Sequence, residues 1–199
     1  MAAALRSLGR SAVAVDADTC LETSGNFGEA DPLSHVVDTG LRGALLPLIQ
    51  AGTIPVVTGF IGHGPDGATT TLGRGGSDFS ATLVGAALRA HEVIIWTDVE
   101  GVYTADPRMV PEARPIAQLH FREAAELSFY GAKVLHQRTI QPLATHGIPV
   151  WIKNSFAPDA AGTVVDGRFT PGSHPVKAIS AIRGQAIVSV EGRGMAGVP

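Results

Sequence analysis

The chain has 199 residues, of which 45% are hydrophobic and 17% are charged, so it can bury a sizeable core and is not a disordered chain. Its formal net charge of −3 provides no broad basic surface for nucleic acid or for an anionic membrane. The single cysteine, Cys20, excludes an internal disulfide framework, and no apolar run approaches the ~20 residues of a membrane helix. We therefore expect a soluble, cytoplasmic protein.

The first sixty residues alternate between helical and extended patterns. In chain order we predict a helix over 1–8, a strand over 11–16, a glycine-rich loop over 23–32, a helix over 41–49 and a strand over 54–58. Gly9 is expected to end the first helix, because glycine readily takes the positive φ found at helix ends. Pro47 is expected to bend or shorten the second helix. The bounded apolar run at 54–58 predicts a strand covered on both faces.

The middle of the chain continues this alternation. Residues 59–73 are rich in glycine and threonine and turn at Pro65-Asp66-Gly67, which predicts a hairpin. A helix over 77–90 follows, with Ser77 or Asp78 as its N-cap. Beyond it we predict a buried strand over 92–97, helices over 122–127 and 133–144, and a strand over 148–153. This order predicts an α/β fold, a three-layer αβα sandwich with a mostly parallel sheet and helices on both faces.

The composition changes after residue 154. Proline, glycine and aspartate become frequent between 158 and 175, which is typical of a linker. Short apolar runs at 176–182 and 186–190 then predict two strands of a second unit, and the sequence ends before that unit could bury a core. We therefore expect three parts, namely a main domain over 1–165, a linker over 166–175 and a truncated second domain over 176–199.

The sequence Thr-Leu-Gly-Arg-Gly-Gly-Ser-Asp at 71–78 combines several features of an anion site. Its glycines let the backbone approach a ligand closely, and the start of the predicted helix offers free N–H groups. The guanidinium of Arg74 can hold a carboxylate through two parallel hydrogen bonds, and Asp78 brings a carboxylate to the same place. A glycine turn capped by Ser77 or Asp78, with Arg74 solvated, is the alternative interpretation. The motif is neither a P-loop nor a dinucleotide fingerprint.

Residues 97–108 form a second polar segment, which begins where the strand predicted over 92–97 ends. Ligands bind at such strand ends in open α/β sheets. Asp98 can accept a hydrogen bond from a ribose hydroxyl or orient a lysine, Tyr103 offers a stacking face, and Arg108 offers a phosphate contact. The alternative is a polar turn without a ligand.

Lys133 lies in a third segment, at the start of the helix predicted over 133–144. A lysine in this place can reach a transferring phosphoryl group with its ammonium. A solvated surface lysine is the alternative, and it is the commoner role of a single lysine.

Together these segments resemble the amino-acid kinase superfamily and, within it, the aspartate kinases. The motifs that carry the resemblance are TLGRGGSD at 71–78, the stretch from WTDV to DPR at 96–108, YGAKVLHQRTI at 130–140, IPVWIKN at 148–154 and Gly162-Thr163. Their order and approximate spacing match the family over most of 54–165. Residues 176–199 resemble the opening of the ACT regulatory domain that follows the kinase domain in this family.

The resemblance implies phosphoryl transfer from ATP, with Mg²⁺, to the β-carboxylate of L-aspartate. The product would be 4-phospho-L-aspartate, and the reaction would be the first step towards lysine, threonine and methionine. The residues implied to bind aspartate are Arg74, Gly75, Gly76 and Ser77, and those implied to be catalytic are Asp78 and Lys133. The residues implied to contact ATP are Thr97, Asp98, Tyr103, Arg108, Lys133 and Val134, and no metal ligand is assigned. We expect Arg74, Asp78, Asp98 and Lys133 to converge on one cleft at the carboxyl edge of the sheet.

Three features depart from the family pattern. The N-terminal strand with a KFGGTS-like loop, whose lysine stabilises the phosphoryl group, is absent, and so is the Gly-Glu pair that helps to hold the substrate. Gln137 stands at the position of a proline. We therefore expect a partial enzyme with little or no kinase activity on its own.

Two other functions stay open. A kinase for glutamate or acetylglutamate belongs to the same superfamily, although the YGAKVLH motif and the ACT-like tail favour aspartate. A non-catalytic piece that binds an amino acid or a nucleotide is favoured by the missing N-terminal loop. The expected partners are L-aspartate, ATP and, in a full-length protein, lysine or threonine as a feedback inhibitor and further copies in a homo-oligomer.

Overall fold

The computed structural model describes residues 1–129, 135–171, 176–182, 184 and 186 of the chain. Its helices are α1 (Ala2–Ser7), α2 (Ser34–Gln50), α3 (Gly76–Ala87), α4 (Phe121–Phe129) and α5 (Gln137–His146), with a short 3-10 helix at Ala17–Thr19. Its strands are β1 (Ala12–Val15), β2 (Ile54–Val57), β3 (Ile61–His63), β4 (Thr69–Thr71), β5 (Val93–Thr97), β6 (Gln118–His120), β7 (Val150–Asn154) and β8 (Thr163–Asp166).

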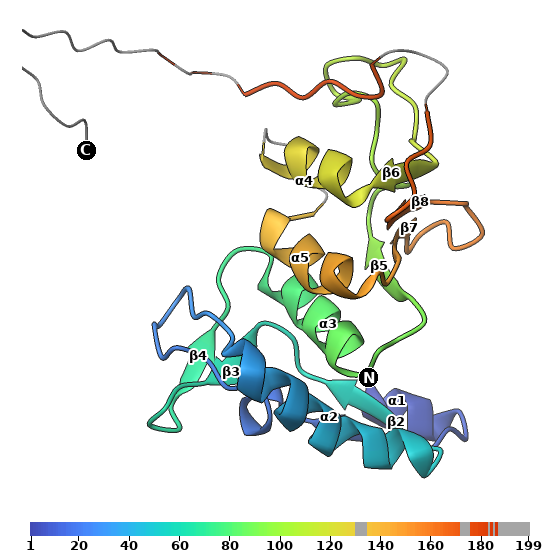
Figure 1. Ribbon diagram of the computed structural model, residues 1–199. Coiled ribbons are helices and arrows are strands. Elements are labelled where there is room, and N and C mark those ends of the chain that lie inside the picture. Colours follow the sequence, from blue (N-terminus) through green and yellow to red (C-terminus); the bar gives the residue numbers. More distant parts are fainter. Residues whose placement is uncertain (130–134, 172–175, 183, 185, 187–199) are drawn as a thin grey trace, which may run out of the picture.

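The strands form three sheets. β1 pairs in parallel with β2, and β3 forms an antiparallel hairpin with β4. The third sheet has the order β5-β7-β8-β6, in which β5 lies parallel to β7, β6 lies parallel to β8, and β7 and β8 are antiparallel. Figure 1 shows α3 and α5 side by side in the middle of the molecule, with α2, β2, β3 and β4 below them and β6 and α4 above. The α/β fold with a mostly parallel sheet, predicted from the sequence, is confirmed.

Helix α3 joins two hydrophobic clusters because it has apolar side chains on more than one face. Ala86 belongs to the cluster that fills the space between α3, α4, α5 and the four-stranded sheet, together with Ile95 and Ile152. Phe79 and Leu83 belong to a second cluster with α2 and the residues around the hairpin. Helix α3 therefore packs against both hydrophobic clusters.

Strand β5 is buried on one face only, which differs from the expected buried strand. Val93 and Ile95 point into the core, whereas Ile94 and Trp96 are 40% and 50% exposed. The reason is that, within the described residues, the helices packed on this sheet lie on the Val93 side. The prediction that β2 is covered on both faces is also wrong, because Ile54 is 44% exposed and the other three residues of the strand are only half-buried.

Several element boundaries differ from those predicted. Helix α2 continues through Pro47 to Gln50, so the proline does not shorten it. The N-cap of α3 is Gly75 rather than Ser77 or Asp78, and no side chain caps the helix. Strands β6 and β8 were not predicted, since each spans only three or four residues.

The predicted second domain lies largely outside the described residues. Its described part, 176–182, has no strand, and the strand predicted there is wrong for these residues. This segment instead lies along the main domain, where the Ile179 N–H donates to the Thr104 carbonyl over 2.8 Å. Across the described ranges, no helix combines the length and the hydropathy that crossing a membrane requires.

Candidate functional site

The loop between β4 and α3 forms an open pocket of about 490 Å³. Its lining residues are Phe60, Gly73, Arg74, Gly75, Gly76, Ser77 and Asp78. The structure thus gathers in one place the four residues predicted to bind the acid and the carboxylate predicted to be catalytic. The prediction missed Phe60, which reaches the pocket from the residue before the hairpin.

The glycines of this loop are required by its backbone and its neighbours. Gly73 and Gly75 have positive φ values of 74° and 72°, a conformation that side chains disfavour. A Cβ atom on Gly76 would lie 2.7 Å from Cδ2 of the Phe60 ring. The glycines therefore allow the loop to lie directly against its neighbours.

Hydrogen-bond donors without a partner lie at the mouth of the pocket. The exposed guanidinium of Arg74 has neither an ion-pair nor a hydrogen-bond partner within the part of the chain that the structure describes. The N–H groups of Ser77 and Asp78, in the first turn of α3, also have no acceptor among these residues. A helix N-terminus and an unpaired guanidinium together suit the carboxylate of a small acid.

Asp78 occupies the third position of α3, next to these donors. Burial raises the pKa of its carboxyl group above the ordinary value of 3.8. The positive end of the helix dipole lies here and favours a negative charge. Asp78 is thus a half-buried acceptor in a site that otherwise presents donors, suited to orient a cationic group of a ligand.

The N-terminus of α5 lies beside the same loop. A Cβ atom on Gly75 would lie 3.0 Å from Cβ of His136, the N-cap of α5, and 3.9 Å from Oγ1 of Thr139. The Thr139 hydroxyl is buried, at 1% exposure, and has no partner within the described ranges. Lys133 and Val134 lie outside the described residues, yet the chain that follows them passes directly next to the pocket.

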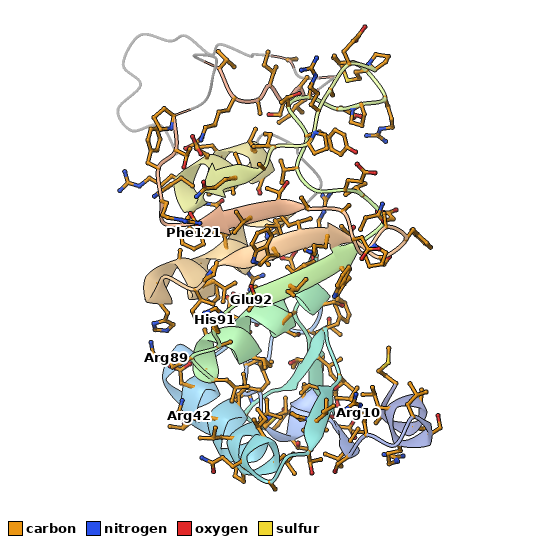
Figure 2. The ribbon with its side chains drawn as sticks, turned by 90° about the vertical axis from the view of Figure 1, so that its right-hand side faces the viewer. Arg10, Arg42, Arg89, His91, Glu92 and Phe121 are labelled. Carbon is orange, nitrogen blue, oxygen red and sulfur yellow. The ribbon has the colours of Figure 1, made fainter. Side chains whose placement is uncertain are left out.

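The second predicted segment lies at the carboxyl end of β5. Figure 2 labels Arg89, His91 and Glu92 in the turn between α3 and β5. Strand β5 packs against α3. Thr97 is the last residue of β5 and Asp98 follows it, and the Thr97 hydroxyl donates to Oδ1 of Asp98 over 3.2 Å. Neither residue lines the pocket itself.

Tyr103 and Arg108 follow in the same loop. Tyr103 is half-buried and forms an isolated bridge with Pro115. Arg108 is 72% exposed, and its guanidinium donates to both carboxylate oxygens of Asp106, through Nε at 3.0 Å and Nη2 at 2.6 Å. A phosphate contact by Arg108 would therefore have to compete with Asp106, and this residue's role is still a prediction.

Known proteins resemble this chain over most of its length. Residues 1–154 match the model of the amino acid kinase family. Lysine-sensitive aspartokinase 3 of Escherichia coli is 40% identical over 180 residues, which are 90% of this chain and 40% of that protein. The chloroplastic bifunctional aspartokinase/homoserine dehydrogenase 2 of Arabidopsis thaliana is 49% identical over 156 residues, 76% of this chain and 17% of that protein.

The same relationship holds in three dimensions. The crystal structure of E. coli aspartokinase III with aspartate and ADP, in its R-state, matches with a TM-score of 0.79 and 42% sequence identity. The match covers 83% of this chain and 37% of that chain, so the sequence spans well under half of these relatives. The chain belongs to the amino acid kinase family, and within it the aspartokinases are similar to it in both sequence and structure.

Proposed function

We propose that this chain forms the acid-binding pocket and part of the nucleotide side of an aspartate kinase. The reaction is transfer of the γ-phosphoryl group of ATP to the β-carboxylate of L-aspartate, which gives 4-phospho-L-aspartate. The observation that carries the proposal is the unpaired Arg74 guanidinium beside the free N–H groups of α3, within a pocket of about 490 Å³. The relative solved with aspartate and ADP supports it.

The pocket holds the acid through its charges. Arg74 and the N–H groups of Ser77 and Asp78 bind a carboxylate of the substrate, while the Asp78 carboxylate orients a cationic group such as the substrate ammonium. The attacking carboxylate has a reference pKa of about 4, so it is ionised at neutral pH and needs no general base. The protein's task is then to hold two anions in line and to neutralise the charge that develops between them.

The nucleotide side is built from the carboxyl end of β5 and the loop that follows it. We assign ATP contacts to Thr97, Asp98, Tyr103 and Arg108, and to Lys133 and Val134, which lie outside the described residues. The proximity of Gly75 to His136 supports the assignment of Lys133, because it brings the segment after Lys133 to the acid pocket. We assign the phosphoryl-stabilising role to Lys133, whose ammonium can neutralise negative charge, and we assign Asp78 as the catalytic carboxylate that organises the site.

A magnesium ion carried by the nucleotide fits this donor set. No three His, Cys, Asp or Glu side chains gather into a metal-binding group in the part of the chain that the structure describes. Mg²⁺ usually takes one or two carboxylates and completes its shell with phosphate oxygens and water. When bound, the ion would neutralise phosphate charge, and Asp78 and Asp98 are the carboxylates that could reach it.

Further assignments concern the full-length protein. We propose an ACT-like regulatory domain that begins near residue 176, and feedback by lysine or threonine; the name of the lysine-sensitive E. coli relative supports lysine. We also propose a homo-oligomer in the cytoplasm. Chloroplastic relatives in plants show that the location of such enzymes varies with the host.

Isothermal titration calorimetry tests the acid and nucleotide sites separately. We expect the chain to bind L-aspartate and Mg-ADP, and Arg74→Met to weaken aspartate binding while ADP binding stays unchanged. Trapping the acyl phosphate with hydroxylamine then tests turnover in the full-length protein. If L-glutamate bound more tightly than L-aspartate, the chain would belong to a kinase for another acid. If only lysine or threonine bound, the chain would be a non-catalytic fragment that senses an amino acid.

A further inference from the structure

Phe60 has an unusual backbone conformation for a large side chain. Its φ is +76°, and Arg89 is the other non-glycine residue with positive φ within the described ranges. This conformation is costly for a residue with a Cβ atom and persists only where its surroundings enforce it. Phe60 is also 40% exposed, so core packing alone does not explain it.

Two hydrogen bonds hold the Phe60 backbone in place. The Phe60 N–H donates to Oγ of Ser80 over 2.9 Å, and the Phe60 carbonyl accepts from the N–H of Leu72 over 2.9 Å. Leu72 belongs to the chain that runs into the glycine loop. The bond to Ser80 is different, because it comes from a side chain on α3 and reaches back over 20 positions.

The Ser80 hydroxyl makes a second bond at the same time. It donates to the Gly76 carbonyl, four residues earlier in α3, over 2.9 Å. A serine inside a helix often bonds the carbonyl four residues back, which leaves its oxygen free to accept another donor. The residue is buried, at 5% exposure, so solvent does not compete for either bond.

One hydroxyl therefore bonds to two residues that line the pocket. Phe60 contributes the aromatic wall, Gly76 begins the helix whose N–H groups face the ligand, and both line the pocket. The ring lies so close to Gly76 that a Cβ there would be 2.7 Å from it. A shift of Phe60 would change the width of the pocket beside Arg74 and Asp78.

We propose that Ser80 is a positioning residue of the acid pocket, acting through the backbone of Phe60 without touching the ligand. This inference rests on the proposed function, because it takes the ligand of the pocket to be L-aspartate. It predicts that loss of the hydroxyl weakens aspartate binding and leaves nucleotide binding unchanged.

The first test compares Ser80→Ala with Thr82→Val by calorimetry with L-aspartate and with Mg-ADP. Thr82 is a matched control, because its hydroxyl is also buried in α3 but donates to the Phe79 carbonyl, away from the pocket. We expect Ser80→Ala to lower aspartate affinity about tenfold, Ser80→Thr to restore most of it, and Thr82→Val to change it less than twofold. Equal effects of Ser80→Ala and Thr82→Val would overturn the proposal.

A double-mutant cycle tests whether Ser80 acts through Phe60. In Phe60→Gly the ring is missing and positive φ is easily adopted, so adding Ser80→Ala should cost little further aspartate affinity. Full additivity of the two changes would contradict the proposed route.

Nuclear magnetic resonance separates this inference from the proposed function. Ser80→Ala should shift the Phe60 amide resonance and accelerate its hydrogen exchange at least tenfold, with recovery in Ser80→Thr and no change in Thr82→Val. If the chain binds no aspartate but the Phe60 amide responds in this way, the proposed function fails and the positioning by Ser80 stands. An unaltered Phe60 amide in Ser80→Ala would refute the positioning itself.

Discussion

The guanidinium of Arg138 donates to the Asp31 carboxylate over 2.6 Å, which joins two residues that are 107 positions apart. The same guanidinium lies 5.1 Å from the centre of the Phe79 ring. Arg138 belongs to α5, Phe79 to α3, and Asp31 to the loop whose Ala30 N–H donates to the Thr71 carbonyl just before the glycines. One arginine therefore ties together three segments that surround the pocket.

We predict that Arg138→Met lowers the free energy of unfolding more than Asp31→Asn does. Asp31→Asn removes only the ion pair, which contributes about 0.5 kcal/mol because Asp31 is 72% exposed. Arg138→Met removes both the ion pair and the contact with the Phe79 ring, so its total loss should be about 1 kcal/mol. Urea denaturation of both variants measures the difference. Equal losses would mean that the contact with Phe79 adds nothing.

Arg74 should not tolerate lysine. A guanidinium can hold a carboxylate through two parallel bonds, and an ammonium cannot reproduce that geometry. We expect Arg74→Lys to weaken L-aspartate binding about tenfold and Arg74→Met about a hundredfold, measured by calorimetry at fixed salt. Arg122→Lys, at an exposed position of α4, is the matched control and should leave the affinity unchanged. An unaffected Arg74→Lys variant would place the carboxylate elsewhere.

Two glycines in helices should respond to alanine in opposite directions. A Cβ on Gly85 of α3 would lie 2.4 Å from Cγ2 of Val93, so Gly85→Ala should destabilise the chain by about 1–3 kcal/mol. A Cβ on Gly43 of α2 meets nothing within 4 Å, so Gly43→Ala should stabilise it by about 0.5–1 kcal/mol. Thermal and urea unfolding give both values. A neutral Gly85→Ala would mean that β5 can move away from α3.

Glu123 should contribute to stability only above acidic pH. Partial burial acts to raise its pKa, but the His120 N–H at 2.8 Å and the Lys177 ammonium at 2.9 Å outweigh this, so the pKa lies below the ordinary value of 4.5. The folded state therefore binds this proton less tightly than the unfolded state. The stabilisation is complete above the unfolded pKa and is lost as the pH falls through the folded pKa.

We accordingly expect Glu123→Gln to cost about 1 kcal/mol at pH 7 and almost nothing well below pH 4. Lys177→Met should show a smaller loss in the same direction, because the backbone donor of His120 is still present. Urea unfolding across this pH range measures both variants. A loss that does not change with pH would show that the charge of Glu123 has no part in it.

Much of the site could be predicted from local sequence. The glycine loop at 71–78 lies between an extended segment and a helix, so neighbouring residues in the chain indicated a candidate site, and the five residues predicted for it at 74–78 line the pocket. The hairpin and the helices around 77–90 and 122–127 were found for the same reason, because their periodicity is contained in the segment itself. The prediction missed Phe60 as a pocket-lining residue, because no pattern in the neighbouring residues indicates that a phenylalanine there adopts positive φ.

The sequence by itself determined the α/β class, the glycine loop and the family resemblance, since periodicity, turn residues and motif order are properties of adjacent residues. Only the tertiary structure decided that His136 lies against Gly75, that Ser80 bonds Phe60, and that β5 is covered on one face. Each of these depends on contacts between residues far apart in the chain. Such contacts form only when separate hydrophobic surfaces pack together, and the sequence of one segment does not identify the surface against which it packs.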